Sequence, residues 1–168
     1  MRFHLPTANT QLLKLILLFS LLLPQLSLAA DTAIYSHKKK GAIKGADAVA
    51  YFSLTAGEKS VIGSNQFTHQ WLGATWKFVS AENRDKFAAD PEAYAPQYGG
   101  YCAYAVSHGF TKPVNPDKWK IVDGKLNLNL NGIAYRRWQK DQDAAIVRAN
   151  TNWPTVLNAC EEKDNCNQ

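Results

Sequence analysis

The chain has 168 residues, of which 46% are hydrophobic and 20% are charged. These values are typical of one globular domain that can bury a core. They exclude a disordered chain, a collagen-like fibre and a miniprotein held together by disulfides alone. The formal net charge is +5, and the basic residues are dispersed along the chain. A nucleic-acid partner is therefore not expected, because such a surface needs basic side chains gathered on one face.

Residues 1–29 have the three parts of a secretory signal peptide. Basic residues flank the start of an apolar run over Leu15–Leu23, and Ser27-Leu28-Ala29 places small residues where a signal peptidase cuts. The run is about half the roughly 20 residues that a spanning helix needs. We predict cleavage after Ala29, with Ala30 as the alternative, and a periplasmic or secreted protein with no stable membrane span after cleavage. An uncleaved N-terminal anchor is the competing interpretation.

The three cysteines fit export to an oxidising compartment. Cys160 and Cys166 lie close together in a polar tail, residues 158–168, and are predicted to form a disulfide that closes a small loop. A metal clip formed by the same pair is the alternative. Cys102 is then unpaired, and is either a buried, inert thiol or a functional one.

The first part of the exported chain predicts a flexible segment followed by a hairpin. Residues 30–44 are polar and lysine-rich, so we expect a mobile lead-in. Val49–Phe52 is a short apolar run suited to a strand. Two alternating segments, 67–72 and 75–79, predict a hairpin that carries Phe67, His69 and Trp71 on one face.

The middle of the chain predicts two helices. Ser80 is a candidate N-cap for a helix that carries Phe87 inward and stops at Asp90–Pro91. After the paired glycines 99 and 100, a helix is expected from Tyr101 to His108. Its 100° steps would place Tyr101, Tyr104 and His108 on one narrow stripe, with Cys102 directed away from it.

The last part predicts a second hairpin and a helix. The hairpin joins Trp119–Val122 to Lys125–Leu130 through an Asp-Gly turn. Residues 133–157 are expected to be helical, with a break near Trp153–Pro154. Strands and helices without a βαβ rhythm indicate one small α+β domain, residues 45–157, in which two β-hairpins pack against helices.

No standard catalytic or cofactor motif is present in the sequence. A thiolate and imidazoles are the ligands that copper and zinc prefer, so Cys102, His69 and His108 are the candidate metal ligands. Each also has a structural interpretation: Cys102 as a buried filler, His69 as a hydrogen-bonded residue among aromatics, and His108 as an exposed residue at the end of a helix.

Two other classes of function stay open. Cys102 activated by a histidine would be a nucleophile of a thiol-dependent enzyme. Alternatively, the protein is a structural or partner-binding module, or binds a small ligand through its aromatic residues. The candidate pocket residues are the tyrosines around Cys102 and in the early apolar run, namely Tyr51, Tyr98, Tyr101 and Tyr104.

Several segments between residues 45 and 157 resemble the exported YHS domain-containing proteins of bacteria. They are Phe67-Thr68-His69, Gly73-Ala74-Thr75-Trp76, Ser80 to Asp85, Tyr94 to Ala105, Ile121 to Leu126 and Asn152-Trp153-Pro154. The resemblance implies a small α+β domain and, from the wider YHS family, metal handling. The YHS domains of metal pumps have paired cysteines, whereas this chain has Asp47-Ala48-Val49-Ala50 at the first position and Ser80 and Asn83 near the second. A paired-thiolate site therefore does not carry over.

The sequence thus predicts an exported, non-enzymatic accessory protein of YHS type. It would bind a copper or zinc ion, or a small ligand, near the helix between Tyr101 and His108.

Overall fold

The computed structural model describes residues 33–163 and residue 166. The predicted signal peptide, residues 1–29, lies outside the described residues. The strands are β1 (Ser36–His37), β2 (Gly41–Ala42), β3 (Ser64–Trp71), β4 (Ala74–Phe78), β5 (Asn115–Val122) and β6 (Lys125–Asn129). The α-helices are α2 (Ala81–Ala89), α3 (Pro91–Tyr94), α4 (Ala103–Val106), α5 (Gly132–Lys140) and α6 (Gln142–Lys163), and short 3-10 turns are η1 (Ile43–Gly45), η2 (Ala50–Ser53) and η3 (Gln97–Gly100).

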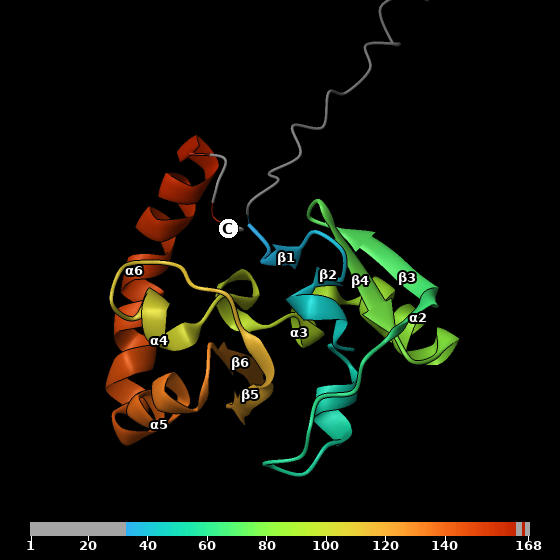
Figure 1. Ribbon diagram of the computed structural model, residues 1–168, viewed down its shortest axis with the longest axis horizontal. Helices are drawn as coiled ribbons and strands as arrows, with labels where there is room; N and C mark the ends of the chain where they lie inside the picture. Colours follow the sequence, from blue (N-terminus) through green and yellow to red (C-terminus); the bar gives the residue numbers. More distant parts are fainter. Residues whose placement is uncertain (1–32, 164–165, 167–168) are drawn as a thin grey trace, which may run out of the picture.

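The predicted α+β class is confirmed. In the described part of the chain the strands pair as three separate antiparallel hairpins, β1–β2, β3–β4 and β5–β6, and do not join into one sheet. Figure 1 shows β3, β4 and α2 on one side of the molecule, and β5, β6 and the helices α4, α5 and α6 on the other. The domain therefore has two packed halves that meet around the short elements in the middle.

The first predicted hairpin and its helix are confirmed. Along β3 the outward residues alternate with half-buried Phe67, His69 and Trp71, as expected for a strand with one face on the core. Ser80 caps α2 by accepting a hydrogen bond from the backbone N–H of Asn83, and the helix ends before Pro91. Phe87 is fully buried against the aromatic rings of β3 and β4, so hairpin and helix share one aromatic cluster.

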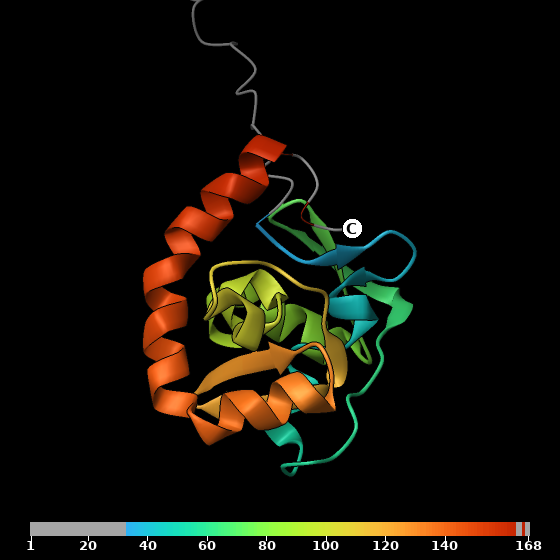
Figure 2. The same ribbon diagram turned by 60° about the vertical axis from the view of Figure 1, so that its left-hand side comes forward.

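The second predicted hairpin is also confirmed, but the helices after it differ from the prediction. The break falls at Asp141, which leaves helical conformation (φ −135°, ψ 41°), and Pro154 lies inside α6. Helix α6 continues to Lys163, past the predicted end at residue 157, and curves along the side of the domain in Figure 2. Asn131 caps α5 with its side chain, which accepts from two backbone N–H groups.

The predicted lead-in is not a mobile arm where the structure describes it. The lysines at 38–40 form the turn between β1 and β2, and the apolar residues on either side are buried, with Tyr35 and Ile43 in the core. The backbone at the paired glycines 99 and 100 helps to hold this segment. The backbone N–H of Tyr35 donates to the carbonyl of Gly99 (2.8 Å), and a Cβ on Gly99 would collide with the carbonyl oxygen of Ala33.

The strand predicted at Val49–Phe52 was wrong. This segment forms the 3-10 turn η2, because Oδ1 of the buried Asp47 accepts hydrogen bonds from the backbone N–H groups of Val49 (2.9 Å) and Ala50 (3.0 Å). An aspartate that caps its own following residues favours a turn over an extended strand.

None of the helices among the described residues is both long and apolar enough to cross a membrane.

Candidate functional site

Cys102 lies immediately before α4 and is buried, with 1% of its surface exposed. Its Sγ accepts a hydrogen bond from the backbone N–H of Leu130 (3.2 Å) and donates to Oδ1 of Asn129 (3.7 Å). Burial raises the pKa of the thiol, and hydrogen bonds from nearby backbone N–H groups oppose part of that rise. The side chain is therefore held as a neutral thiol at neutral pH.

His69 lies in the other half of the molecule. It is half-buried on β3, and its ring packs edge-on against the ring of Phe87 with 6.0 Å between ring centroids. Figure 1 shows β3 and α2 on the opposite side of the molecule from α4, where Cys102 lies. The structure thus does not bring His69 and Cys102, two of the predicted metal ligands, together.

Three of the four predicted pocket tyrosines belong to the core. Tyr51, Tyr98 and Tyr101 are buried, with exposed fractions of 1%, 5% and 0%. The hydroxyl of Tyr51 donates to the carbonyl of Pro116 (2.9 Å), and that of Tyr98 donates to Oδ1 of Asn150 (2.9 Å). Because the residues before Ala103 are extended, Tyr101 is not part of a helical stripe and points into the core instead.

Tyr104 and His108 are brought together as the sequence predicted. Helix α4 is only one turn long, but hydrogen bonds from Ser107 and His108 to its carbonyls extend the turn, so residues four apart still face the same way. The two rings pack with their centroids 4.4 Å apart. Nδ1 of His108 lies 2.8 Å from the carbonyl oxygen of Tyr104. Since a carbonyl only accepts, Nδ1 carries the hydrogen, and Nε2 is the ring nitrogen left to meet a ligand.

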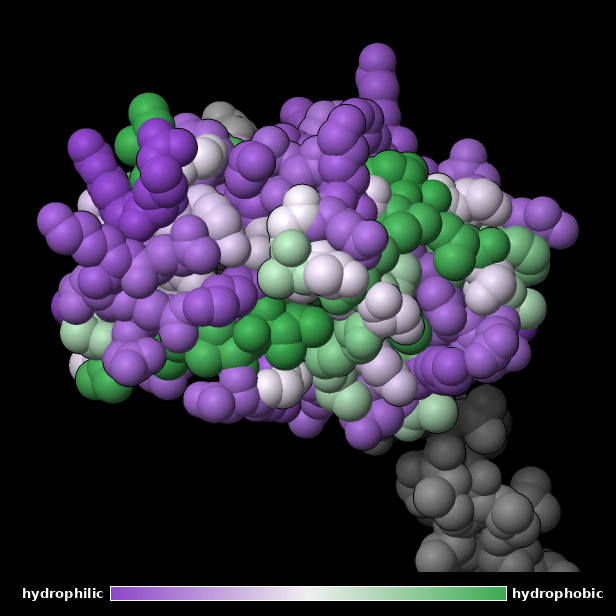
Figure 3. All heavy atoms as spheres, turned by 90° about the horizontal axis from the view of Figure 1, so that it is seen from below, coloured by the Kyte–Doolittle hydropathy of each residue, from purple (hydrophilic) through white to green (hydrophobic). Residues whose placement is uncertain are grey.

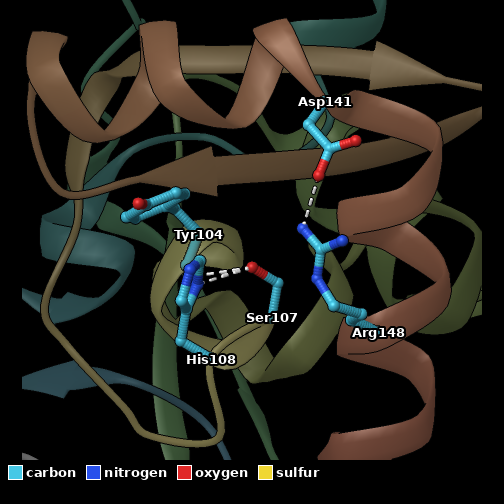
Figure 4. Close-up of polar contacts among 5 residues, drawn as sticks. All are labelled: Tyr104, Ser107, His108, Asp141 and Arg148. Atoms are coloured by element: carbon cyan, nitrogen blue, oxygen red, sulfur yellow. Dashed lines mark hydrogen bonds and ion pairs between the residues drawn. The ribbon is translucent and has the colours of Figure 1, made fainter.

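These two residues line a shallow depression at the junction of α4, α5 and α6. Its other lining residues are Arg137, Lys140, Asp141, Ala145 and Arg148. Figure 4 shows Tyr104 and His108 on one side of this depression and the ion pair of Asp141 and Arg148 on the other. That pair is 2.7 Å long and about half exposed at both side chains, so it contributes little to stability.

The depression is electrostatically positive. Asp141 is the one acid among its lining residues, and Arg148 already pairs with it. Arg137 and Lys140 then contribute positive charge that no acid of the lining neutralises. Both also lie in the last turn of α5, where cations interact favourably with the helix dipole. The arrangement can attract a small anion and offer it guanidinium and ammonium donors.

The basic residues of this depression were missed in the sequence. Arg137 and Lys140 are spaced three apart on one helix, which places them on the same face. Their approach to Arg148 depends on the break at Asp141, whereas a straight helix from 133 to 157 would carry Arg148 about three turns from Arg137 and about two turns from Lys140.

The donor set does not fit a metal centre that shares Cys102 with a histidine. The sulfur faces a backbone N–H and a carboxamide in the core, while His108 is exposed and His69 packs on Phe87. Across the described residues, no three or more His, Cys, Asp or Glu side chains gather in a group that could hold a metal ion. The copper or zinc ion remains a prediction from the sequence.

The predicted disulfide between Cys160 and Cys166 is confirmed. Cys160 lies buried on α6, and Cys166 packs against the core. The bond therefore secures the end of α6 and takes no part in the depression.

The exposed apolar side chains are spread over several elements. On the face shown in Figure 3, hydrophobic side chains form separate areas among polar ones. The large exposed apolar residues are Phe52, Ile62, Leu72, Val79, Phe110, Ile133 and Val147. Single exposed side chains of this kind are normal on a soluble surface and do not by themselves indicate a partner.

Comparison with known proteins found no relative of this chain: no protein-family model, curated protein or solved structure matches it. The structure of this chain is therefore the basis for describing it as a small α+β domain with a basic depression at one helix junction. A role for that depression has to be argued from its chemistry.

Proposed function

We propose that this protein is an exported, non-enzymatic binding protein whose ligand is a small anion held in the depression between α4, α5 and α6. The observation that carries the proposal is the excess of positive charge around Tyr104 and His108, where Asp141 is the one acid and is already paired. A carboxylate or phosphate group would receive hydrogen bonds from Arg137 and Lys140, and the planar guanidinium of arginine can donate two parallel hydrogen bonds to two oxygens of either group.

Export is supported by the signal peptide features of residues 1–29 and by the disulfide at the C-terminal end of α6. The resemblance to exported YHS proteins points the same way. A binding role is favoured over a thiol-dependent enzyme because the thiol of Cys102 is buried and its pKa is raised, which disfavours the reactive thiolate.

The first test is calorimetric titration of the chain from Ala30 onward with inorganic phosphate and, separately, with succinate, at constant ionic strength. Arg137→Gln should weaken the binding of the preferred anion about tenfold, because a hydrogen bond to a charged group is lost. The two anions distinguish a phosphate site from a carboxylate site.

Arg136→Gln is the matched control, because Arg136 is an exposed neighbour on α5 that does not line the depression. It changes the net charge by the same amount and should leave the affinity unchanged. Equal loss in both variants, or no binding of either anion by the unaltered chain, would refute the proposal.

A further inference from the structure

A second basic depression, which shares no lining residue with the first, lies where the β1–β2 hairpin meets β5. Three lysines, Lys40, Lys44 and Lys59, line a depression there together with Ser60 and Ile62. Lys38 and Lys39 precede Lys40 in the exposed turn of the hairpin. The fold thus brings Lys44 and Lys59 beside Lys40, the last residue of the run of lysines at 38–40.

One acidic group offsets the charge of these lysines only in part. Asp117 is the one acid that lines the depression, and its Oδ1 accepts hydrogen bonds from both the backbone N–H (2.9 Å) and the hydroxyl (2.8 Å) of Ser60. These bonds, with Lys59 and Lys118 nearby, lower the pKa of Asp117 and hold it as a carboxylate. The ion pairs found among the described residues involve none of the lysines of this surface.

The backbone presents this lysine surface in a fixed and strained conformation. Ile43 (φ 42°) and Lys44 (φ 60°) are consecutive left-handed residues, a conformation that is unfavourable for a β-branched residue such as isoleucine. The strain is sustained because the Ile43 side chain is fully buried, and the backbone of Gly63 bonds to that of Gly45 (2.9 Å). The buried side chain of Ile43 therefore fixes the backbone conformation at Lys44, so this lysine does not belong to a loose loop.

The chemistry of this surface fits lipid headgroups. All its cations are lysines, which bind phosphate as point charges and do not need the bidentate geometry of arginine. Ile62, which is 60% exposed, stands at the edge of the depression. An aliphatic side chain beside a phosphate-binding surface has no use in binding a free ion, but it can enter the acyl boundary of a bilayer.

We propose that the surface formed by Lys38, Lys39, Lys40, Lys44 and Lys59 docks the protein on a membrane rich in anionic phospholipid, with Ile62 at the contact. The basic depression at the α4–α5–α6 junction does not take part in this docking. Binding to the membrane is electrostatic and reversible, and it weakens as salt screens the lysines.

The test is flotation of the chain from Ala30 onward with vesicles of phosphatidylglycerol and phosphatidylcholine, compared with vesicles of phosphatidylcholine alone. Cooperative thermal unfolding first establishes that each variant is folded. We expect binding to the anionic vesicles only. The triple variant Lys40→Gln, Lys44→Gln, Lys59→Gln should lower the partition coefficient about 100-fold, on the order of fivefold for each lysine.

The matched control replaces three exposed lysines elsewhere, Lys86, Lys112 and Lys125, by glutamine, which gives the same net charge. It should bind the vesicles nearly as well as the unaltered chain. Ile62→Ser should weaken binding severalfold without changing its dependence on salt, since it removes apolar contact and no charge.

Three results would overturn the proposal. One is an equal loss of binding in the two triple variants, which would mean that net charge alone is responsible. Another is equal binding to neutral vesicles. The third is displacement from the vesicles by inorganic phosphate at constant ionic strength, which would make the depression a site for the free ion.

Discussion

At the scale of single residues, Cys102 shows how burial decides the chemistry of a side chain. Asn129 on β6 is fully buried and uses one oxygen to accept from the thiol of Cys102 and from the backbone N–H of Tyr104 (3.2 Å). Leu130 donates to the sulfur from the same strand end. The thiol is thus a structural link between β6 and the start of α4, which is the inert role that the sequence left open for it.

This position predicts slow alkylation of Cys102. Because Cys160 and Cys166 are bonded to each other, iodoacetamide in the absence of a reductant reports on Cys102 alone among the described cysteines. We expect the rate near neutral pH to be at least 100-fold lower in the folded protein than in urea, since burial disfavours both access and the thiolate. Mass spectrometry of quenched samples measures the rate.

Rapid alkylation of the folded protein would contradict this prediction and restore the thiol-dependent enzyme as a candidate.

A zinc titration tests separately whether the sulfur of Cys102 is a metal ligand. Cys102→Ser should leave any weak affinity for zinc unchanged, whereas a large loss would show that the sulfur is a ligand.

At the scale of elements, Asp47 joins parts of the chain that are distant in sequence. Its Oδ1 accepts from the backbone N–H groups of Val49 and Ala50 at the start of η2. Its Oδ2 accepts from the backbone N–H of Val79 (2.9 Å) in the β4–α2 connection and from the side chain of Asn83 (2.7 Å) in the first turn of α2. One fully buried carboxylate thus organises two turns at once.

We expect Asp47→Ala to lower the free energy of unfolding by about 3 to 5 kcal/mol, because it leaves several buried donors without an acceptor. Asp47→Asn keeps one acceptor oxygen and should lose less. The exposed Asp85, whose carboxylate pairs with Arg84, provides the control: Asp85→Ala should change stability by less than about 1 kcal/mol. Urea unfolding measures all three, and similar values for Asp47→Ala and Asp85→Ala would show that the network is dispensable.

The elements that the sequence predicted well are those with a local signal. Alternation along Phe67–Trp71, the N-cap at Ser80 and the Asp-Gly turn at 123–124 each act within a few residues, so their structures follow directly from the sequence. The turn at Val49–Phe52, in contrast, depends on Asp47, which also bonds to Val79 and Asn83 far along the chain. The apolar run by itself predicted a strand, because it carries no signal of those distant bonds.

The candidate site was predictable only where it was local. Tyr104 and His108 are four residues apart, and helical spacing placed them together even though the helix is shorter than expected. The basic side of the depression needed the break at Asp141, which carries neither proline nor glycine as a signal. We predicted the break near Pro154 instead, but a proline can remain inside a helix that packs well elsewhere.

At the scale of the whole molecule, aromatic residues form the core of both halves. Trp76, Phe78 and Phe87 fill one half, and Tyr101 lies between Tyr35 and Trp153 in the other, with ring centroids 5.7 Å and 6.2 Å away. This composition gives a large buried area from few side chains. It also places phenol groups where ionisation is unfavourable, so the stability of the fold as a whole depends on pH in the alkaline range.

Burial raises the pKa of Tyr98 to about 12, and it also raises the pKa values of Tyr51 and Tyr101. In the unfolded chain a tyrosine titrates near 10. The folded protein therefore holds these protons more tightly than the unfolded chain does. Their contribution to stability is complete below about pH 10 and is lost as the pH rises through the folded values.

We accordingly predict cooperative unfolding above pH 10, accompanied by a step in tyrosinate absorbance in place of a gradual titration. Tyr98→Phe removes one of the titrating groups but also the hydrogen bond to Asn150, so it should cost about 1 kcal/mol at neutral pH. The difference in free energy of unfolding between this variant and the unaltered protein should shrink as the pH rises above 10. Ionisation of Tyr98 destabilises the unaltered protein there, whereas the variant has no phenol at this position. Urea unfolding at a series of alkaline pH values measures that difference. A deficit that stays constant up to pH 12 would show that the Tyr98 phenol ionises in the folded protein as freely as in water.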